Sequence, residues 1–140
     1  MQSDLLEHLR EAVRLDAGNA SAQADLGDAL QEKGDIDGAL SSYRTAVGLV
    51  ANSASLRSNL GYLLVRKGDL ASAIKEWQEA TRIDPKYAPP YANLGEAFES
   101  TGDKAGAAAA YDKFLELAPD SPTAAEVRKR LAALKESAGP

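Results

Sequence analysis

A period of 34 residues runs through this chain and restricts its fold more than any other feature. The pair Leu-Gly recurs at 26–27, 60–61 and 94–95, and the pair Gly-Asp recurs at 34–35, 68–69 and 102–103. Alanine keeps the same step at 20, 54 and 88, and again at 39, 73 and 107, where an aromatic residue follows four positions later. Several positions that repeat together indicate a stack of similar supersecondary units.

Each repeated position has a packing role in a pair of antiparallel helices. Small residues such as Gly61 and Ala73 allow two helices to approach closely, and Trp77, one turn later, fills the space between them. Gly-Asp ends the first helix and starts the second, because glycine accepts a left-handed cap and aspartate caps free amides. Pro85 and Pro119 end the second helices. Apolar residues follow helical spacing, and no segment alternates as a strand does.

These positions resemble the tetratricopeptide repeat family, whose pattern is aromatic-x-x-Leu-Gly-x-x-aromatic, then alanine, aromatic and proline. The resemblance covers residues 20–121 as three repeats, at 20–53, 54–87 and 88–121. The first aromatic position departs from the pattern, since Gln23 and Arg57 occupy it and only Tyr91 conforms. The resemblance implies an all-α, right-handed α-solenoid of helix-turn-helix repeats with one extra helix at each end. We expect seven helices and no sheet.

The N-terminal segment, residues 1–19, is predicted to be the second helix of an incomplete repeat. Leu5, Leu9 and Ala12 fall on the positions that 39, 43 and 46 occupy in the next repeat. Either the segment was cut from a longer array or it is a native cap. A cut is favoured, because Leu5 and Leu9 would otherwise face solvent, whereas a cap needs a polar outer face.

The C-terminal segment, residues 122–140, is predicted to be an amphipathic capping helix with a short tail. Ser121-Pro122 is expected to open it, by the preference for serine at the cap and proline at the first helical position. The predicted apolar stripe consists of Ala124, Val127, Leu131 and Leu134.

Composition excludes several classes of function. The 140 residues include no cysteine and a single histidine, His8, so no metal or cofactor site is expected. The net charge is −5 with no basic stripe, which argues against nucleic-acid binding. No apolar run approaches the ~20 residues that span a bilayer, and the start lacks a signal-peptide layout. Membrane insertion is not expected, and a cytoplasmic setting is the default.

Catalysis is not expected either. The acid pairs Asp25 with Asp28 and Glu96 with Glu99 each share a helix face, as a general acid and base could. An open groove offers little of the desolvation that such chemistry needs. We therefore predict that the chain is not an enzyme.

The family resemblance implies a scaffold that binds another protein or peptide segment in a concave groove lined by the first helices. The expected groove residues are Asp25, Asp28, Asn59, Tyr62, Arg66, Asn93, Glu96 and Glu99. Asn59 and Asn93 match a family asparagine that holds a ligand's backbone. With Glu32 included, acids outnumber cations in this set, so a basic or neutral segment is preferred. The clamp for chaperone tails is disfavoured, because it needs lysine or arginine at several of these positions.

The sequence is also compatible with two other functions. The apolar edge of Leu5, Leu9 and Ala12 could stack against another copy and give a weak homo-oligomer or a self-assembling scaffold. Alternatively, the chain could be the accessory domain of a larger enzyme.

Overall fold

The computed structural model describes residues 2–137, and within that range every regular element is an α-helix. The helices are α1 (Gln2–Leu15), α2 (Ala20–Glu32), α3 (Ile36–Leu49), α4 (Ala54–Lys67), α5 (Leu70–Ile83), α6 (Pro89–Thr101), α7 (Lys104–Leu117) and α8 (Ala124–Ser137). The expected number of seven was wrong: three two-helix repeats give six helices, and the flanking helices raise the total over these residues to eight.

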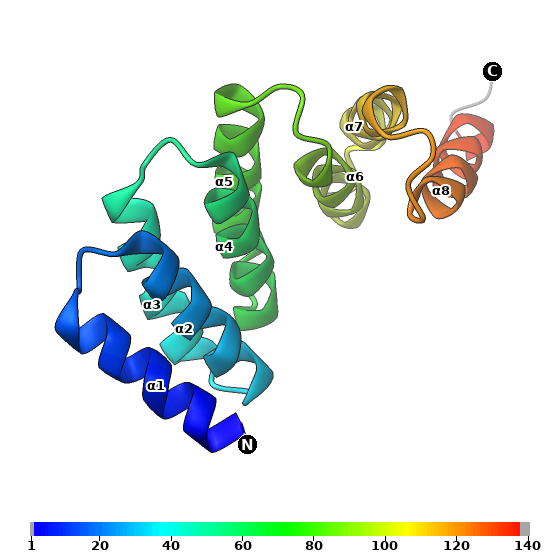
Figure 1. The fold of residues 1–140 in the computed structure, drawn as a ribbon. Helices are drawn as coiled ribbons and strands as arrows, with labels where there is room; N and C mark the ends of the chain where they lie inside the picture. The colour runs from blue at the N-terminus through cyan, green and yellow to red at the C-terminus, as the bar shows by residue number, and fades with distance from the viewer. Residues whose placement is uncertain (1, 138–140) are drawn as a thin grey trace. The chain divides into compact units, whose positions relative to one another are not determined.

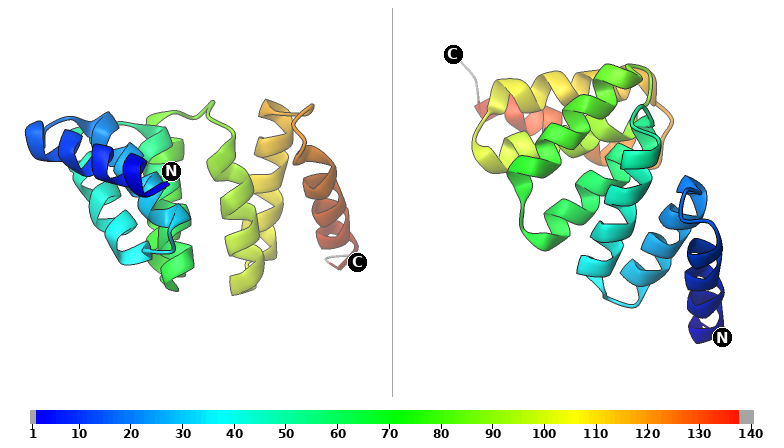
Figure 2. Two further views of the ribbon diagram at one scale, coloured as in Figure 1. Left: turned by 60° about the horizontal axis from the view of Figure 1, so that its bottom comes forward. Right: turned by 90° about the vertical axis from the view of Figure 1, so that its left-hand side faces the viewer.

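The helices form two compact units, and the boundary between the units falls inside α5, at Glu76–Trp77. In the first unit α1 packs against α2, α2 against α3, and α3 against α4 (Figure 1). In the second unit α6 packs against α7, and α7 against α8 (Figure 2). Each unit is thus a run of helices in which neighbours in sequence are neighbours in space.

The Gly-Asp pairs form the turns that the sequence predicts. Gly34, Gly68 and Gly102 have φ of 86°, 92° and 86°, the left-handed region that glycine occupies without a Cβ clash. The aspartate that follows each glycine caps the next helix. For example, the Asp35 carboxylate accepts a hydrogen bond from the Gly38 amide at 2.9 Å, and Asp103 accepts one from Gly106 at 2.8 Å.

The small residues of the repeat allow close contact between helices. In the first unit Ala39 is 0% exposed and Tyr43 is 2% exposed, and a Cβ built on Gly27 of α2 would lie 2.6 Å from the Tyr43 ring. Gly95 meets the Tyr111 ring in the same way in the second unit. Glycine at these two positions is therefore required by the aromatic ring that lies against it.

The C-terminal helix begins later than the sequence suggested. It starts at Ala124 instead of Pro122, because the Ser121 hydroxyl accepts from the Thr123 amide at 3.2 Å and closes a turn before the helix. The predicted apolar stripe is confirmed, since Ala124, Val127, Leu131 and Leu134 are all buried. This stripe packs with Tyr111 and Phe114 in one core cluster.

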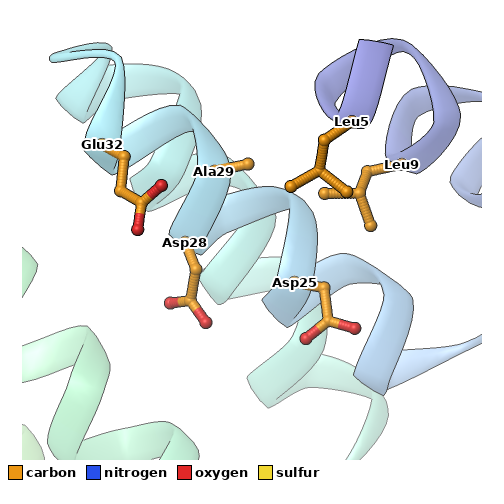
Figure 3. Close-up of a pocket in the computed structure, with 6 residues that line it drawn as sticks. All are labelled: Leu5, Leu9, Asp25, Asp28, Ala29 and Glu32. Carbon is orange, nitrogen blue, oxygen red and sulfur yellow. The ribbon is translucent and has the colours of Figure 1, made fainter. Parts of the chain in front are cut away.

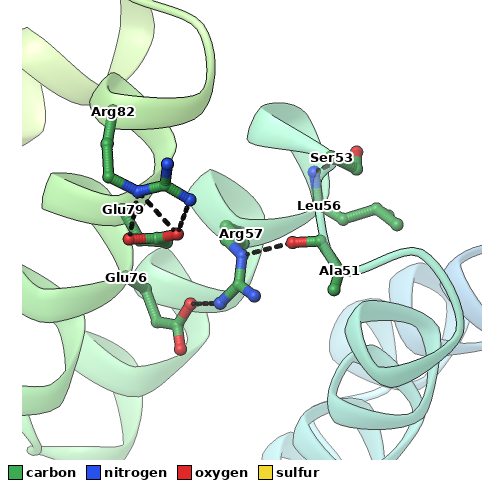
Figure 4. Close-up of polar contacts among 7 residues, drawn as sticks. All are labelled: Ala51, Ser53, Leu56, Arg57, Glu76, Glu79 and Arg82. Atoms are coloured by element: carbon green, nitrogen blue, oxygen red, sulfur yellow. Dashed lines mark hydrogen bonds and ion pairs between the residues drawn. The ribbon is translucent and has the colours of Figure 1, made fainter.

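A side chain donates a hydrogen bond to one carbonyl in each loop that leads from one repeat to the next. Gln23 donates to the carbonyl of residue 17 at 3.2 Å, Arg57 to that of 51 at 2.8 Å (Figure 4), and Tyr91 to that of 85 at 2.9 Å. The acceptors are 34 residues apart and each donor lies six residues later. The next acceptor in the series, residue 119, is bonded by Arg128 at 2.7 Å. Gln23, Arg57 and Tyr91, which all occupy the first aromatic position of a repeat, thus make equivalent hydrogen bonds although their side chains differ.

None of the described helices combines the length and apolar character that a membrane-crossing segment needs.

Candidate partner-binding surfaces

The first unit carries the predicted groove residues of α2 and α4. Asp25 and Asp28 lie on α2, and Asn59, Tyr62 and Arg66 lie on α4; all five are exposed. Asp28 and Arg66 line a common hollow of about 540 Å³ with Gln31 and Glu32. Tyr62 is 50% exposed and Val65 of the same helix is 40% exposed. Large apolar side chains with that exposure are candidates for contact with a partner.

Asp28 and Asn59 are also committed to a contact inside the unit. The buried Tyr43 hydroxyl donates a hydrogen bond to the Asp28 carboxylate. Burial raises the pKa of Tyr43 well above its usual range, the Asp28 carboxylate raises it further, and the Asn59 side chain opposes the rise. Asp28 therefore presents only part of its hydrogen-bonding capacity to a ligand.

A pocket of about 260 Å³ lies between α1 and α2 (Figure 3). Leu5 and Leu9 reach into it from α1 toward Ala29 of α2, and three carboxylates lie along α2. Those carboxylates belong to Asp25, Asp28 and Glu32. The sequence placed Leu5 and Leu9 on a separate self-association edge; the structure brings them together with two of the predicted groove acids. Ala12, the third residue of that edge, is exposed and does not line this pocket.

The acids of this pocket have little internal compensation. Over residues 2–137, neither Asp25 nor Glu32 takes part in an ion pair, and Asp28 is bonded by a neutral phenol. The pocket therefore presents an apolar floor beside uncompensated negative charge.

In the second unit, unlike the first, a cation lies beside the predicted acids. Asn93, Glu96 and Glu99 lie on α6, where Glu96 is exposed and the other two are half-buried. Arg130 of α8 approaches Glu96 at 3.7 Å and Glu99 at 3.5 Å. The Tyr111 hydroxyl also donates to Glu99. These carboxylates are thus partly neutralised by the chain's own last helix.

Arg130 and the tyrosine–carboxylate bonds are the site features that the sequence did not predict. The Tyr111 hydroxyl and the two glutamates raise the pKa of Arg130, so the guanidinium stays charged beside them. Asp28 precedes its tyrosine by 15 residues, whereas Glu99 precedes its tyrosine by 12. The two tyrosines occupy the same position of the repeat but the two acids do not, so the 34-residue pattern does not indicate which acid accepts the bond.

No group of His, Cys, Asp and Glu side chains in the described part of the chain is arranged to hold a metal ion. The candidate sites described above are three surfaces: the exposed face of α2 and α4, the α1–α2 pocket, and the α6 face beside Arg130.

Comparison with known proteins identifies the fold. A family model described as TPR repeat matches residues 27–68 and 61–102, and one described as tetratricopeptide repeat matches 88–121. No curated protein sequence matches the chain. Among solved structures, one titled "Crystal structure of MamA" has a TM-score of 0.85 at 23% identity, over 96% of this chain and 77% of that one.

Two further solved structures have similar folds. The first TPR of Spaghetti (RPAP3), bound to the HSP90 peptide SRMEEVD, has a TM-score of 0.76 at 20% identity over 84% of this chain and 94% of that one. The Arabidopsis OM64 TPR domain has a TM-score of 0.75 at 25% identity over 81% and 94%. The family models cover more than half of the chain and agree with its helical repeats and glycine turns. The chain belongs to the tetratricopeptide repeat family.

Proposed function

We propose that this chain is a non-catalytic scaffold that binds a segment of a partner protein across the exposed face of α2 and α4, the first helices of its first two repeats. Proteins of this family are generally non-enzymatic scaffolds, and one structural neighbour is bound to a peptide. The observation that carries the proposal is Tyr62, a half-exposed aromatic residue on a first helix. Aromatic residues of this kind supply much of the binding energy at protein interfaces.

The surface favours a basic or neutral segment. On α2, Asp25 and Glu32 are free of ion pairs within the described residues, and Arg66 shares a hollow with Glu32 but not with Asp25. A cationic segment would gain mainly in association rate, and an acidic one would be repelled. The peptide in the Spaghetti structure contains two glutamates and an aspartate. This chain is expected to prefer basic or neutral segments over acidic ones such as that peptide.

A peptide-display experiment tests this function. We expect a random 16-residue library selected on the purified chain to yield peptides with lysine or arginine around an apolar residue. Tyr62→Ala should weaken their binding by roughly tenfold or more, the loss typical of an interface hot spot. The matched control is Leu49→Ala, which truncates a 44% exposed residue on the second helix α3. Equal affinity of both variants would place the site away from the first helices.

Self-assembly is the second candidate, and Leu5 is the observation that favours it. Its side chain is 53% exposed at the N-terminal edge of the first unit. A second copy that covered this edge would give head-to-tail contacts. Light scattering on the purified chain distinguishes the two functions, since a mass that rises with concentration and falls back in Leu5→Glu with Leu9→Glu would support assembly. A role as an accessory domain of a larger enzyme predicts that the full open reading frame encodes a catalytic domain, which sequencing of that frame tests.

A further inference from the structure

The α1–α2 pocket lies where the repeat pattern calls for another helix. The register aligns Leu5, Leu9 and Ala12 of α1 with residues 39, 43 and 46 of α3. On α3 these positions are 0%, 2% and 0% exposed, and residue 43 contacts α2, the first helix of the same repeat. On α1, Leu5 is 53% exposed, Leu9 is half-buried and Ala12 is exposed. The surface that a first helix covers on α3 is therefore open on α1.

The residues in this pocket specify more than a generic apolar contact. Leu9 stands where α3 has a tyrosine whose ring meets Gly27, and Leu5 stands where α3 has an alanine. The smaller Leu9 side chain leaves room for an occupant with a side chain larger than glycine at that contact. Leu5, Leu9 and Ala29 together offer a floor for an aliphatic residue.

The carboxylates of α2 determine which charge the occupant should carry on the edge that faces this helix. Asp25, Asp28 and Glu32 lie at spacings of three and four, so their carboxylates form one row along the helix. In the second unit the carboxylates of α6 are met by Arg130, whereas Asp25 and Glu32 have no such cation among the described residues. An occupant with lysine or arginine along one edge would supply the missing compensation.

We infer that the α1–α2 pocket binds an amphipathic helix of a partner protein, with leucine-like residues on Leu5, Leu9 and Ala29 and a basic edge along Asp25, Asp28 and Glu32. The inference rests on the proposed function only in that the ligand is a protein segment. It assigns that segment to a surface distinct from Tyr62. A helix is the fitting occupant because a helix fills the corresponding position in the next repeat.

A second copy of this chain fits the pocket less well than such a partner. Among the described residues, the exposed large apolar side chains are Leu5, Leu15, Leu49, Val50, Tyr62 and Val65. None lies on α8, the helix with Arg128, Lys129 and Lys135 exposed, whose apolar stripe is buried in its own unit. The helix α1 offers Leu5 and Leu9, but its Glu7 would face like charge and its Arg14 is already paired with Glu11. The helix α4 does carry the exposed Tyr62 and Val65 beside Arg66 and Lys67, but Lys67 is already paired with Asp37 at 2.7 Å, so this end of the helix matches a row of three carboxylates poorly.

The test uses a designed peptide and the whole chain. The probe is a fluorescein-labelled, alanine-based 18-residue helix with leucines at i, i+4 and i+7 and four lysines along one adjacent edge. The control peptide has glutamate in place of each lysine. Fluorescence anisotropy at low salt should show the basic peptide binding at least roughly tenfold more tightly, because opposite charges favour the complex and like charges oppose it.

Paired variants locate the binding. Leu5→Asn should weaken the basic peptide by roughly tenfold or more, whereas Leu15→Asn, at a 71% exposed leucine outside the pocket, should not. Asp25→Lys with Glu32→Lys should do the same, with Asp112→Lys and Glu136→Lys as the matched charge control. Circular dichroism confirms that each variant keeps its helices.

Four results would overturn the inference, and the last of them leaves the proposed function standing. The first is equal binding of the two peptides, and the second is binding that survives both the Leu5 and the charge variants. The third is a concentration-dependent mass of the chain alone that Leu5→Asn abolishes, which would assign the pocket to a second copy. Peptide binding lost in Tyr62→Ala but kept in Leu5→Asn would sink this inference and leave the proposed function standing. Peptide binding lost in Leu5→Asn but kept in Tyr62→Ala would support this inference and count against the proposed function.

Discussion

Gly27 shows how a single residue sets the distance between two helices. A Cβ at this position would lie 2.6 Å from the Tyr43 ring, which is itself buried and held by its bond to Asp28. Real Cβ atoms do not approach a neighbour this closely, so either the ring or the helix must move. The repeated glycine is therefore a packing requirement and not a source of flexibility.

Gly27→Ala is expected to lower the free energy of unfolding by about 1–3 kcal/mol through overpacking. Gly48→Ala is the matched control, because a Cβ there meets nothing within 4 Å and lies inside α3. The control should be neutral or raise stability by up to about 1 kcal/mol, since alanine favours helix over glycine. Urea unfolding followed by circular dichroism gives both values. Similar midpoints for the two variants would contradict the contact with Tyr43.

Tyr43 also predicts how stability depends on pH. Burial and Asp28 raise its pKa in the folded chain, whereas an unfolded tyrosine ionises near pH ~10. Above that pH the unfolded chain binds fewer protons than the folded chain, so the free energy of unfolding falls as pH rises. Below about pH 10 the contribution of Tyr43 to the free energy of unfolding is fully present.

Tyr43→Phe should therefore lose less stability than the unmodified chain between about pH 9 and pH 11. The comparison requires urea midpoints at both ends of that range, with the exposed Tyr62→Phe as control. The control should follow the unmodified chain. A pH dependence that is the same in all three proteins would show that Tyr43 ionises as easily in the folded state as in the unfolded one.

At the scale of the element, the sequence predicted helix ends correctly where a single residue type determines the backbone conformation or the cap. Glycine is almost alone in accepting the left-handed turn, and aspartate accepts the free amides, so the turns at 34, 68 and 102 could be read directly. The start of α8 could not, because Ser121 stabilises a turn as readily as a helix cap. Contacts such as Arg130 with Glu99 depend on how α8 lies against α6, which local sequence does not encode.

The cap at Asp103 offers a direct test at this scale. Its carboxylate accepts from the Gly106 amide at the start of α7. Asp103→Ala should cost about 0.5–2 kcal/mol of unfolding free energy, the usual loss for a helix cap. Asp112→Ala, at an exposed position in the middle of the same helix, should stay within about 0.5 kcal/mol. Thermal unfolding of the two variants side by side provides the measurement.

At the scale of the whole molecule, the chain consists of two units that each bury their own core. The second unit gathers Tyr111, Phe114 and the apolar stripe of α8 into one cluster. The repeat period predicted a stack of three repeats with a helix at each end, but neither its division into two units nor the place where the units divide. The division falls inside α5, a continuous helix whose sequence shows no break.

Leu131→Ala is expected to loosen the second unit first. Truncating a buried leucine costs about 2–5 kcal/mol, and in repeat proteins that loss acts mainly on nearest neighbours. Native-state hydrogen exchange should therefore accelerate more in α6, α7 and α8 than in α2, α3 and α4. Uniform acceleration across all of these helices would show that the units unfold as one.

The bonded carbonyls of the inter-repeat loops have a consequence for how such chains change over time. Acceptor and donor sit on opposite sides of each junction, at residues 17 and 23, 51 and 57, and 85 and 91. Any donor can serve any acceptor, because the acceptor is main chain and glutamine, arginine and tyrosine all reach it. A duplication, deletion or shuffling event that preserves the 34-residue spacing therefore recreates the junction bond without a compensating mutation. Arrays of this kind can gain or lose a repeat in one genetic step and still form the hydrogen bond at every junction between repeats.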